Sequence, residues 1–271
     1  GVVGGMPELP DVEGFRRVAR HAEKRQVRDV RVHDAQVLRG VGGEEFREAV
    51  RRRYFGEPRR HGKWLLIPTG GAPNATPAEP VVVAHFGMTG SFEWCDHGTE
   101  AHQHDRVVFD FSAGELRYHD MRKLTGLHLA RRQDDVDDLL AELGPDAQRI
   151  GLGEFGERLT RTRRGTKAAL MDQSVLAGLG NICTDELLWR ARVHPNRTTT
   201  QLSSDDLERM HGEMRAMLRA AVRAGHVPDD AAWLTGHRDE PDPRCPRCST
   251  PLRRTRIGGR GTLWCPTCQP Q

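Results

Sequence analysis

Cys245-Pro-Arg-Cys248, followed after sixteen residues by Cys265-Pro-Thr-Cys268, is the stretch that decides how the C-terminal end of the chain folds. Two Cys-x-x-Cys pairs at this separation supply four thiolates on two tight turns, which suits a tetrahedral Zn²⁺ with Zn–S bonds of about 2.3 Å. Four cysteine ligands leave no open coordination position, so we expect one structural Zn²⁺ per chain. A pair of disulfides or a redox-active Cys-x-x-Cys is the alternative, and nothing else in the sequence resembles a secreted protein.

The loop between the two cysteine pairs is basic. It contains no acidic residue, glycines flank Arg260, and its arginines are Arg253, Arg254, Arg256 and Arg260. A guanidinium group can pair with two phosphate oxygens at once. The loop is therefore a candidate phosphate-binding finger, and a solvated charged loop explains its composition equally well.

Length and charge set the next bounds. The 271 residues leave room for two domains of ordinary size besides the finger. The formal net charge is only +3, so a nucleic-acid surface would require local clustering of charge. We find no apolar run of about 18 residues and no charged-then-apolar leader. We expect a monomer in the bacterial cytoplasm, without a membrane partner.

The first half of the chain has the pattern of a β-rich domain. Residues 1–6 are expected to be a leader, with Met6-Pro7 as the original start. Apolar residues on one face predict a helix from Asp11, as its N-cap, to about Lys24. Extended segments are expected at 27–41, 64–67, 81–85, 107–111 and 116–118. One helix followed by several short strands predicts a β-sandwich or barrel over residues 7–130.

The second half has a helical pattern from Asp134 to about Ala224, which predicts a helical domain at 131–240 and a zinc finger at 241–271. The expected helices are one marked by the apolar residues Val136, Leu139, Leu140 and Leu143, followed by 168–176, 184–192 and 203–223. A glycine turn, Gly178-Leu-Gly180-Asn181, precedes one helix start. The free amides there and the Asn181 side chain could bind a DNA phosphate. An ordinary helix connection capped by Asn181 is the alternative.

Five motifs then occur in one order along nearly the whole chain from Met6. They are Met-Pro-Glu-Leu-Pro-Asp-Val-Glu at 6–13, Gly-Lys-Trp-Leu-Leu at 62–66, His-Phe-Gly-Met-Thr-Gly-Ser at 85–91, Met-Asp-Gln-Ser-Val-Leu-Ala-Gly-Leu-Gly-Asn-Ile at 171–182, and Gly-Arg-Gly-Thr-Leu-Trp-Cys-Pro-Thr-Cys-Gln at 259–269. Together they resemble the formamidopyrimidine-DNA glycosylase and endonuclease VIII family.

The resemblance implies an α+β multidomain fold. An N-terminal β-sandwich with a leading helix is joined to a helix-two-turns-helix domain and a zinc finger held by Cys245, Cys248, Cys265 and Cys268. The family clamps double-stranded DNA that contains a damaged base or an abasic site, flips the damaged base, excises it, and cleaves the abasic strand. We therefore expect a DNA repair glycosylase with abasic-site lyase activity.

The resemblance also implies catalytic residues. Pro7, once Met6 is removed, matches the nucleophilic N-terminal proline that forms a Schiff base with the sugar. An α-amino group has an ordinary pKa of about 8, against about 10.4 for lysine, so more of it is unprotonated at neutral pH. Glu8 matches the general acid/base that protonates the sugar ring oxygen. Lys63 matches a hairpin lysine that contacts the damaged strand.

DNA-binding residues follow in the same way. Asn181, Arg260 and Lys167 match phosphate binders that kink the duplex and hold the flipped nucleotide. Without the resemblance each of these residues, like Glu8 and Lys63, has an ordinary structural or surface role as its alternative.

Void-filling residues show a departure from the family. Oxidised-purine members use Met, Arg and Phe to fill the space left by the flipped base. Met88 fits the first, and Asp120-Met-Arg-Lys-Leu124 stands where the family has Asp-Pro-Arg-Arg-Phe. Arg122 then reads the orphaned base, Lys123 replaces a second arginine, and Leu124 replaces the phenylalanine wedge. A one-residue register shift would instead place Lys123 in the reading role. Leucine does not stack, so we expect weaker opposite-base selectivity.

Two further departures bear on the reaction. Residues 226–244 are shorter than the segment that covers 8-oxoguanine in oxidised-purine members, so we expect no strict 8-oxoguanine specialist. If Met6 stays attached, Pro7 has a non-nucleophilic amide nitrogen. A monofunctional glycosylase for alkylated or bulky bases, or a non-catalytic damaged-DNA-binding protein, is then the alternative. A zinc module for protein contacts is a third, which the lack of exposed aromatic anchors in the arginine loop disfavours.

Overall fold

The structure is a computed structural model that describes residues 5–271, so most of the predicted leader lies outside the described residues. The chain forms two compact units, and the division falls within the first helix. The β unit comprises Val12–Ala141. The helical unit combines the N-terminal residues up to Asp11 with Glu142–Gln271.

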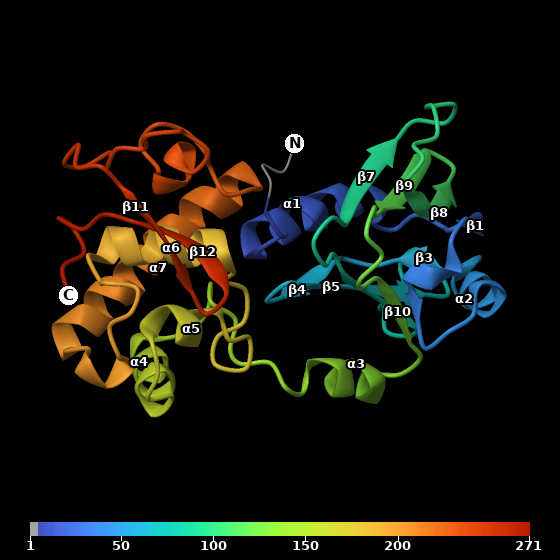
Figure 1. The fold of residues 1–271 in the computed structure, drawn as a ribbon. Coiled ribbons are helices and arrows are strands. Elements are labelled where there is room, and N and C mark those ends of the chain that lie inside the picture. Colours follow the sequence, from blue (N-terminus) through green and yellow to red (C-terminus); the bar gives the residue numbers. More distant parts are fainter. Residues whose placement is uncertain (1–4) are drawn as a thin grey trace. The chain divides into compact units, whose positions relative to one another are not determined.

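The β unit is built from two sheets, which confirms the predicted sandwich. The first has the order β1 (Asp29–Val32), β8 (Asp105–Phe111), β9 (Gly114–His119), β7 (Ser91–Cys95). The second has the order β2 (Leu38–Arg39), β10 (Leu127–Ala130), β6 (Val81–His85), β5 (Trp64–Gly70), β3 (Tyr54–Phe55), and β4 (Arg59–His61) also pairs with β5. All pairings are antiparallel except β10 with β2. Figure 1 shows β7, β8 and β9 as a separate layer from β5 and β10.

Phenylalanine side chains fill the space between the sheets. Phe55, Phe109 and Phe111 are almost completely buried, and the Phe55 ring meets the other two edge-on at centroid distances of 5.4 and 5.2 Å. They belong to one apolar cluster with residues of both sheets, such as Ile67 and Leu116. Burying these rings contributes to the driving force for closing the sandwich.

The first helix begins earlier than predicted. Helix α1 spans Leu9–Ala19 and a 3₁₀ turn, η1, continues it at Arg20–Ala22. The prediction of Asp11 as N-cap is wrong, because its Oδ2 accepts the N–H of Glu8 at 2.8 Å from inside the first turn. This is the reciprocal half of a capping box, in which the third helical residue reaches back to the cap. Pro10 fits there because the first turn needs no N–H from it.

Other predicted boundaries in the β unit also change. Residues 27–41 are not one extended segment, because a 3₁₀ turn, η2 (Ala35–Val37), separates β1 from β2. Asp34 stabilises this turn by accepting the N–H of Gln36 at 3.0 Å. Sequence reasoning missed strand β7 and helix α2 (Gly43–Val50). Helix α3 (Gln133–Leu140) belongs to the β unit and packs Val136 into a small apolar cluster on β6 and β10.

The helical unit contains α4 (Leu152–Arg161), α5 (Thr166–Met171), α6 (Asn181–Ala191) and α7 (Ser204–Ala224), with 3₁₀ turns η3 (Thr199–Gln201) and η4 (Leu234–His237). Helix α4 was not predicted, and α6 begins three residues before the expected start. Ser203 caps α7 by accepting the N–H of Asp206, and Gly225 ends it at φ +78°. Met210, Met214 and Met217 of α7 are fully buried in the core.

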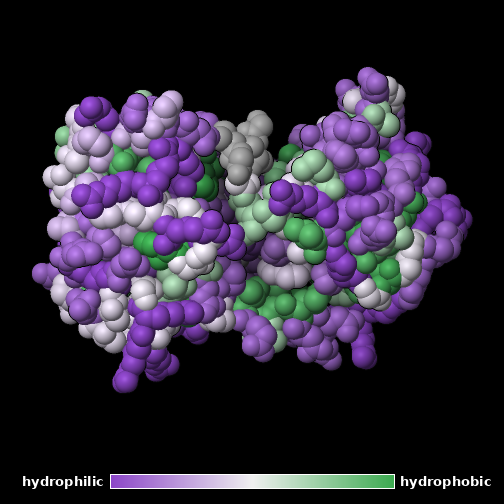
Figure 2. Space-filling view, in the orientation of Figure 1, coloured by the Kyte–Doolittle hydropathy of each residue, from purple (hydrophilic) through white to green (hydrophobic). Residues whose placement is uncertain are grey.

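A two-stranded hairpin completes the helical unit. Strands β11 (Arg253–Ile257) and β12 (Arg260–Trp264) pair in antiparallel register between the two cysteine pairs. The face shown in Figure 2 is mostly hydrophilic, with smaller hydrophobic areas. None of the helices in residues 5–271 is long and apolar enough to span a membrane.

Candidate active site and nucleic-acid interface

Pro7 and Glu8 are buried against the start of helix α6. The Glu8 side chain is 2% exposed, and its carboxylate accepts N–H groups from Ile182 at 2.9 Å, from Cys183 at 3.2 Å and from Gly180. These are amides of the first helical turn, which have no partner within the helix. The carboxylate therefore has a fixed position directly after Pro7.

Glycine is required at position 180 for this arrangement. A Cβ atom there would lie 2.7 Å from the Glu8 Cδ atom. The backbone also holds the segment from the other side, since the N–H of Leu9 donates to the Gly178 carbonyl at 3.0 Å. The glycine turn that the sequence indicated thus receives Glu8 as the cap of α6, a role that sequence reasoning gave to Asn181.

Asp11 is a second carboxyl group beside Glu8. The pKa of Asp11 is raised to about 6, mainly by burial and also by the neighbouring negative charge of Glu8, while the hydrogen bond from the Glu8 N–H opposes the rise. Such a group changes its charge near neutral pH. Sequence reasoning had treated Asp11 only as a helix cap.

Asn181 and Lys167 meet at one backbone carbonyl of the finger hairpin. The Gly261 oxygen accepts hydrogen bonds from Asn181 Nδ2 at 2.9 Å and from Lys167 Nζ at 3.5 Å. Arg260 directly precedes Gly261 in the chain. Within residues 5–271 the Arg260 side chain is exposed and makes no hydrogen bond or ion pair, whereas Asn181 Oδ1 is buried without a partner. The structure thus brings the three predicted phosphate binders of the helical unit together.

Lys167 differs from the other two in its environment. Its side chain is 1% exposed, and Nζ donates to Asp185 Oδ1 at 2.7 Å and to Thr262 Oγ1 at 2.6 Å. Burial lowers the pKa of Lys167, and Asp185 opposes this effect. In this arrangement the amine holds the hairpin on the helices and is not presented to solvent.

Asp185 organises the same region, and sequence reasoning missed it. Its other oxygen accepts Arg238 Nη2 at 2.6 Å and the N–H of Leu263 at 3.1 Å. One buried carboxylate therefore connects α5, α6, β12 and the segment after η4. An acidic residue in a mostly apolar helix, Asn181–Ala191, was the available sequence signal.

The four cysteines form the expected metal-binding cluster. Their sulfur atoms all lie within 4.8 Å of one another, and Cys248 Sγ is 3.6 Å from both Cys265 Sγ and Cys268 Sγ. Cys245 Sγ lies 3.8 Å from Cys268 Sγ. A tetrahedron with Zn–S bonds of about 2.3 Å has edges of about 3.8 Å, so the residues present fit Zn²⁺. Trp189 Nε1 also donates to Cys245 Sγ at 3.3 Å, which orients this ligand from outside the cluster.

In the β unit, Lys63 lies in the turn between β4 and β5. Only 9% of its surface is exposed, and within the described chain its amine has no hydrogen-bond or ion-pair partner. Burial and the nearby Lys63 charge lower the pKa of His85 to about 4, so this ring is neutral at pH 7. The Gly87 N–H donates to His85 Nδ1 at 3.1 Å, which leaves the proton on Nε2. His85 is within a quoted motif, yet sequence reasoning gave it no role.

Two neighbouring loops of the β unit carry the predicted void fillers. Met88 lies in the turn after β6, and Arg122 and Leu124 lie between β9 and β10. Met88 is 37% and Leu124 59% exposed, and Arg122 Nη1 is 3.2 Å from Met88 Sδ. The structure thus brings Met88 and Arg122 into contact.

Lys123 points elsewhere. Its amine binds Asp34 Oδ2 at 2.8 Å and Gln36 Oε1 at 2.9 Å, and its backbone has the left-handed φ of +54°. The register that makes Arg122 the reading residue fits this geometry, because the Lys123 amine already has two protein partners.

Three models of protein domains match the chain in sequence. They describe the formamidopyrimidine-DNA glycosylase N-terminal domain at residues 6–127, the H2TH domain of the same enzyme at 143–229, and a zinc finger found in FPG and IleRS at 243–271. A formamidopyrimidine-DNA glycosylase from Acidothermus cellulolyticus is 35% identical, covering 98% of both chains. The chain belongs to the formamidopyrimidine-DNA glycosylase family.

Other relatives and solved structures agree with this family assignment. The formamidopyrimidine-DNA glycosylase of Geobacillus kaustophilus is 34% identical over 97% of this chain and all of its own length. The Lactococcus lactis enzyme bound to DNA with an abasic site has a TM-score of 0.86 at 25% identity, covering 98% of this chain and 100% of its own. A mutant of that enzyme with Fapy-dG DNA has a TM-score of 0.87, 25% identity and the same coverage. These matches confirm the predicted family and fold class.

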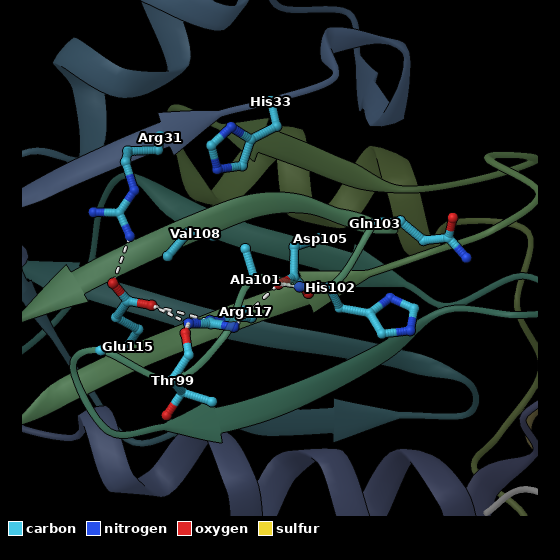
Figure 3. A pocket seen from close by; sticks show the side chains of 11 residues that line it. Arg31, His33, Thr99, Ala101, His102, Gln103, Asp105, Val108, Glu115 and Arg117 are labelled. Atoms are coloured by element: carbon cyan, nitrogen blue, oxygen red, sulfur yellow. Dashed lines mark hydrogen bonds and ion pairs between the residues drawn. The ribbon is translucent and has the colours of Figure 1, made fainter.

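The β unit of this glycosylase-family chain also has a charged cavity of about 470 Å³ on the sheet that contains β1, β8 and β9. Figure 3 shows Glu115 between the guanidinium groups of Arg31 and Arg117. Arg117 also binds Asp105 Oδ2 at 3.2 Å and the carbonyl of Thr99 at 2.9 Å. Burial by itself would raise the pKa of Glu115, but Arg31 and Arg117 hold this pKa below its usual range. Because the charges are paired with one another, this network supports the loop after β7.

Proposed function

We propose that this chain excises damaged bases from double-stranded DNA and cleaves the resulting abasic site through Pro7. The observation that carries the proposal is the burial of Pro7-Glu8 on the N-terminus of α6, where three backbone N–H groups hold the Glu8 carboxylate. A carboxyl group fixed beside an N-terminal amine supplies a nucleophile and a proton carrier at one point.

The proposed reaction begins when the free Pro7 amine attacks C1′ of the damaged nucleotide. The bond between C1′ and the base breaks, and the base leaves with the electron pair and takes up a proton. Glu8 protonates the sugar ring oxygen, the C1′–oxygen bond opens, and a Schiff base forms at Pro7. Loss of a C2′ proton then expels the 3′ phosphate, and hydrolysis of the Schiff base releases the protein.

Phosphate contacts are proposed for both units. In the helical unit Arg260 supplies an exposed guanidinium and Asn181 is fixed beside it by the Gly261 carbonyl. In the β unit Lys63 supplies an amine without a protein partner among residues 5–271, and neutral His85 supplies an Nε2–H donor. We propose Lys167 as a residue that reaches a phosphate indirectly, by positioning the hairpin that carries Arg260.

The zinc is structural in this proposal. Bound to the four cysteines it holds the two knuckles together, so that β11 and β12 present Arg260. The names of the relatives and the DNA in the solved complexes support a glycosylase with lyase activity, and they do not favour the monofunctional or non-catalytic alternatives. We further propose that the chain acts on chromosomal DNA in the bacterial cytoplasm, as the bacterial relatives suggest.

We also propose a lesion range broader than 8-oxoguanine. The segment 226–244 is tied to the helical unit, because Glu186 accepts the Thr235 N–H at 3.1 Å and Asp185 accepts Arg238. A segment fixed in this way has little length left to close over a base. Competition between duplexes with 8-oxoguanine, a ring-opened purine or an oxidised pyrimidine tests this point, and exclusive cleavage of the first would refute it.

The decisive experiment is borohydride trapping on a duplex with an abasic site. Protein that begins at Pro7 should give a covalent adduct, whereas the chain with residues 1–6 attached and a Pro7→Gly variant blocked by an N-terminal acetyl group should not. A Glu8→Gln variant that begins at Pro7 should still bind the duplex. Absence of an adduct with the free proline would reject Pro7 as the nucleophile.

A further inference from the structure

Three of the four exposed large hydrophobic side chains in the described residues lie on the two void-filler loops. They are Met88 at 37%, Met121 at 51% and Leu124 at 59% exposure; the fourth, Leu152, is in the helical unit. Exposed apolar groups gathered around one guanidinium indicate a binding surface. Met121 was not among the predicted DNA-binding residues.

The loop that carries Met121 is fixed at both ends. At its start, Asp120 is 2% exposed and accepts Thr89 Oγ1 at 2.6 Å and the Arg122 N–H at 3.1 Å. At its end, Thr125 Oγ1 donates to the His85 carbonyl at 3.2 Å, and a Cβ on Gly126 would lie 1.7 Å from the Val37 oxygen. The exposure of Met121 is therefore imposed by a rigid backbone.

The middle of the loop has a third anchor. Lys123 binds Asp34 and Gln36, and its carbonyl accepts Arg39 Nη2 at 2.9 Å. With Lys123 turned toward the protein, the side chains left exposed on the loop are Met121, Arg122 and Leu124. Arg122 thus lies between the apolar side chains of Met121 and Leu124, and Met88 contacts it from the turn after β6.

We propose that Met121 is an additional specificity-determining residue that enters the duplex with Met88 and Leu124 and contacts the orphaned base, while Lys123 positions the loop. This inference rests on the proposed base-flipping function. Flipping leaves a void that must be filled, and neither Met88 nor Leu124 has an aromatic ring that could stack on the neighbouring bases. Methionine has three rotatable bonds and a polarisable sulfur, so it adapts to bases of different size. The surface therefore accepts several opposite bases.

The test uses protein that begins at Pro7 and duplexes with a lesion or a preformed abasic site opposite each of the four bases. Met121→Ala should lower lesion excision by up to about tenfold, the upper end of what a methionine sulfur contact with an aromatic ring contributes, and leave abasic-site cleavage within about twofold. Met121→Leu should restore most of the loss. Leu152→Ala is the matched control, because it removes another large exposed apolar side chain, at 40% against 51% exposure, elsewhere.

A fluorescent 2-aminopurine opposite a stable abasic analogue gives a second readout. The wild type should change its fluorescence on binding, and Met121→Ala should reduce that change. Equal behaviour of Met121→Ala and Leu152→Ala on all substrates would overturn the inference, whereas a wild type that neither excises nor traps would reject the proposed function itself.

The role given to Lys123 has its own test. If Lys123 only positions the loop, Asp34→Asn, which keeps an oxygen to accept the Gln36 N–H, and Lys123→Ala should cause similar losses of excision, and the double variant should lose no more than either. A change in opposite-base preference with Lys123→Ala alone would show that Lys123 reads the base and would overturn this part.

Discussion

At the scale of single residues, Glu8 and Asp11 are two carboxyl groups three positions apart that have different environments. Glu8 is held by backbone amides of α6, whereas Asp11 is buried next to it and accepts the Glu8 N–H. A buried carboxyl with few donors favours its protonated form. The fold therefore keeps an ionisable group near Pro7 that is costly to charge.

Asp11→Asn should stabilise the helical unit at high pH. The pKa of Asp11 rises from 3.8 in the unfolded chain to about 6 in the fold, so the unfolded state releases its proton first and ionisation opposes folding as pH rises through this window. The difference corresponds to about 3 kcal/mol above pH 7 and about half of that at pH 5. Denaturant unfolding at pH 5 and pH 8 measures it. Asp239→Asn, at an exposed position, is the control, and a pH-independent difference would contradict the assignment.

Arg260 provides a second prediction at this scale. Its exposed guanidinium should neutralise one phosphate, so Arg260→Ala should weaken binding to a duplex with an abasic analogue and reduce the slope of log affinity against log salt by about 0.9. Arg158→Ala should leave the slope unchanged, because Arg158 pairs with Glu154 on α4 at 2.9 Å. DNA-binding titrations at several salt concentrations measure the slope. Identical slopes for the two variants would show that Arg260 does not contact a phosphate.

At the scale of elements, the start of α6 is the most constrained part of the helical unit. Its free amides receive Glu8, its first residue contacts the finger hairpin, and Asp185 within it binds Lys167 and Arg238. One helix therefore fixes both the proposed proton carrier and the phosphate-binding hairpin. Small shifts at its N-terminus should affect both.

Gly180→Ala should impair catalysis more than folding. The added Cβ would lie 2.7 Å from Glu8 Cδ and must displace the carboxylate, and a displacement of about 1 Å can reduce a rate about 100-fold. The matched control is Gly212→Ala in α7, where nothing lies within 4 Å and alanine should add about 1 kcal/mol of stability. Single-turnover excision and denaturant unfolding separate the two effects. Full activity of Gly180→Ala would show that the position of Glu8 is unimportant.

At the scale of the whole molecule, the two units have separate cores. The β unit closes around its phenylalanines, and the helical unit around methionine and leucine side chains of α6 and α7. The finger adds a small cluster of its own, in which three cysteines pack with Trp189 and Leu263. A cluster of that size needs the metal to remain folded.

Removal of zinc should therefore abolish DNA binding and leave the β unit folded. Chelation should collapse the hairpin that carries Arg260 and lower the affinity for a duplex with an abasic analogue by about 100-fold or more, and added Zn²⁺ should restore it. Fluorescence anisotropy of the labelled duplex measures the loss. Undiminished DNA binding by the metal-free protein would show that Arg260 and the finger do not take part in DNA recognition.

The sequence alone determined those features that depend on residue type and local spacing. The metal ligands follow from two Cys-x-x-Cys pairs, and the sandwich and the helical unit follow from apolar periodicity. The motif at 6–13 predicts roles for Pro7 and Glu8 only through its resemblance to the glycosylase family, since the residues themselves allow an ordinary structural role for Glu8. Boundaries such as the start of α1 were misplaced, since the cap bond of Asp11 runs back to Glu8.

Only the tertiary structure decided which polar groups meet. Lys167 is 18 positions from Asp185, Lys123 is 89 from Asp34, and Glu8 is 174 from Ile182. No local pattern encodes such pairs, because a lysine looks the same in sequence whether its amine binds a buried carboxylate or faces solvent. The exposure of Met121 is of the same kind, since the residues on either side of it are anchored by hydrogen bonds to Thr89 and to the His85 carbonyl, more than 30 positions away.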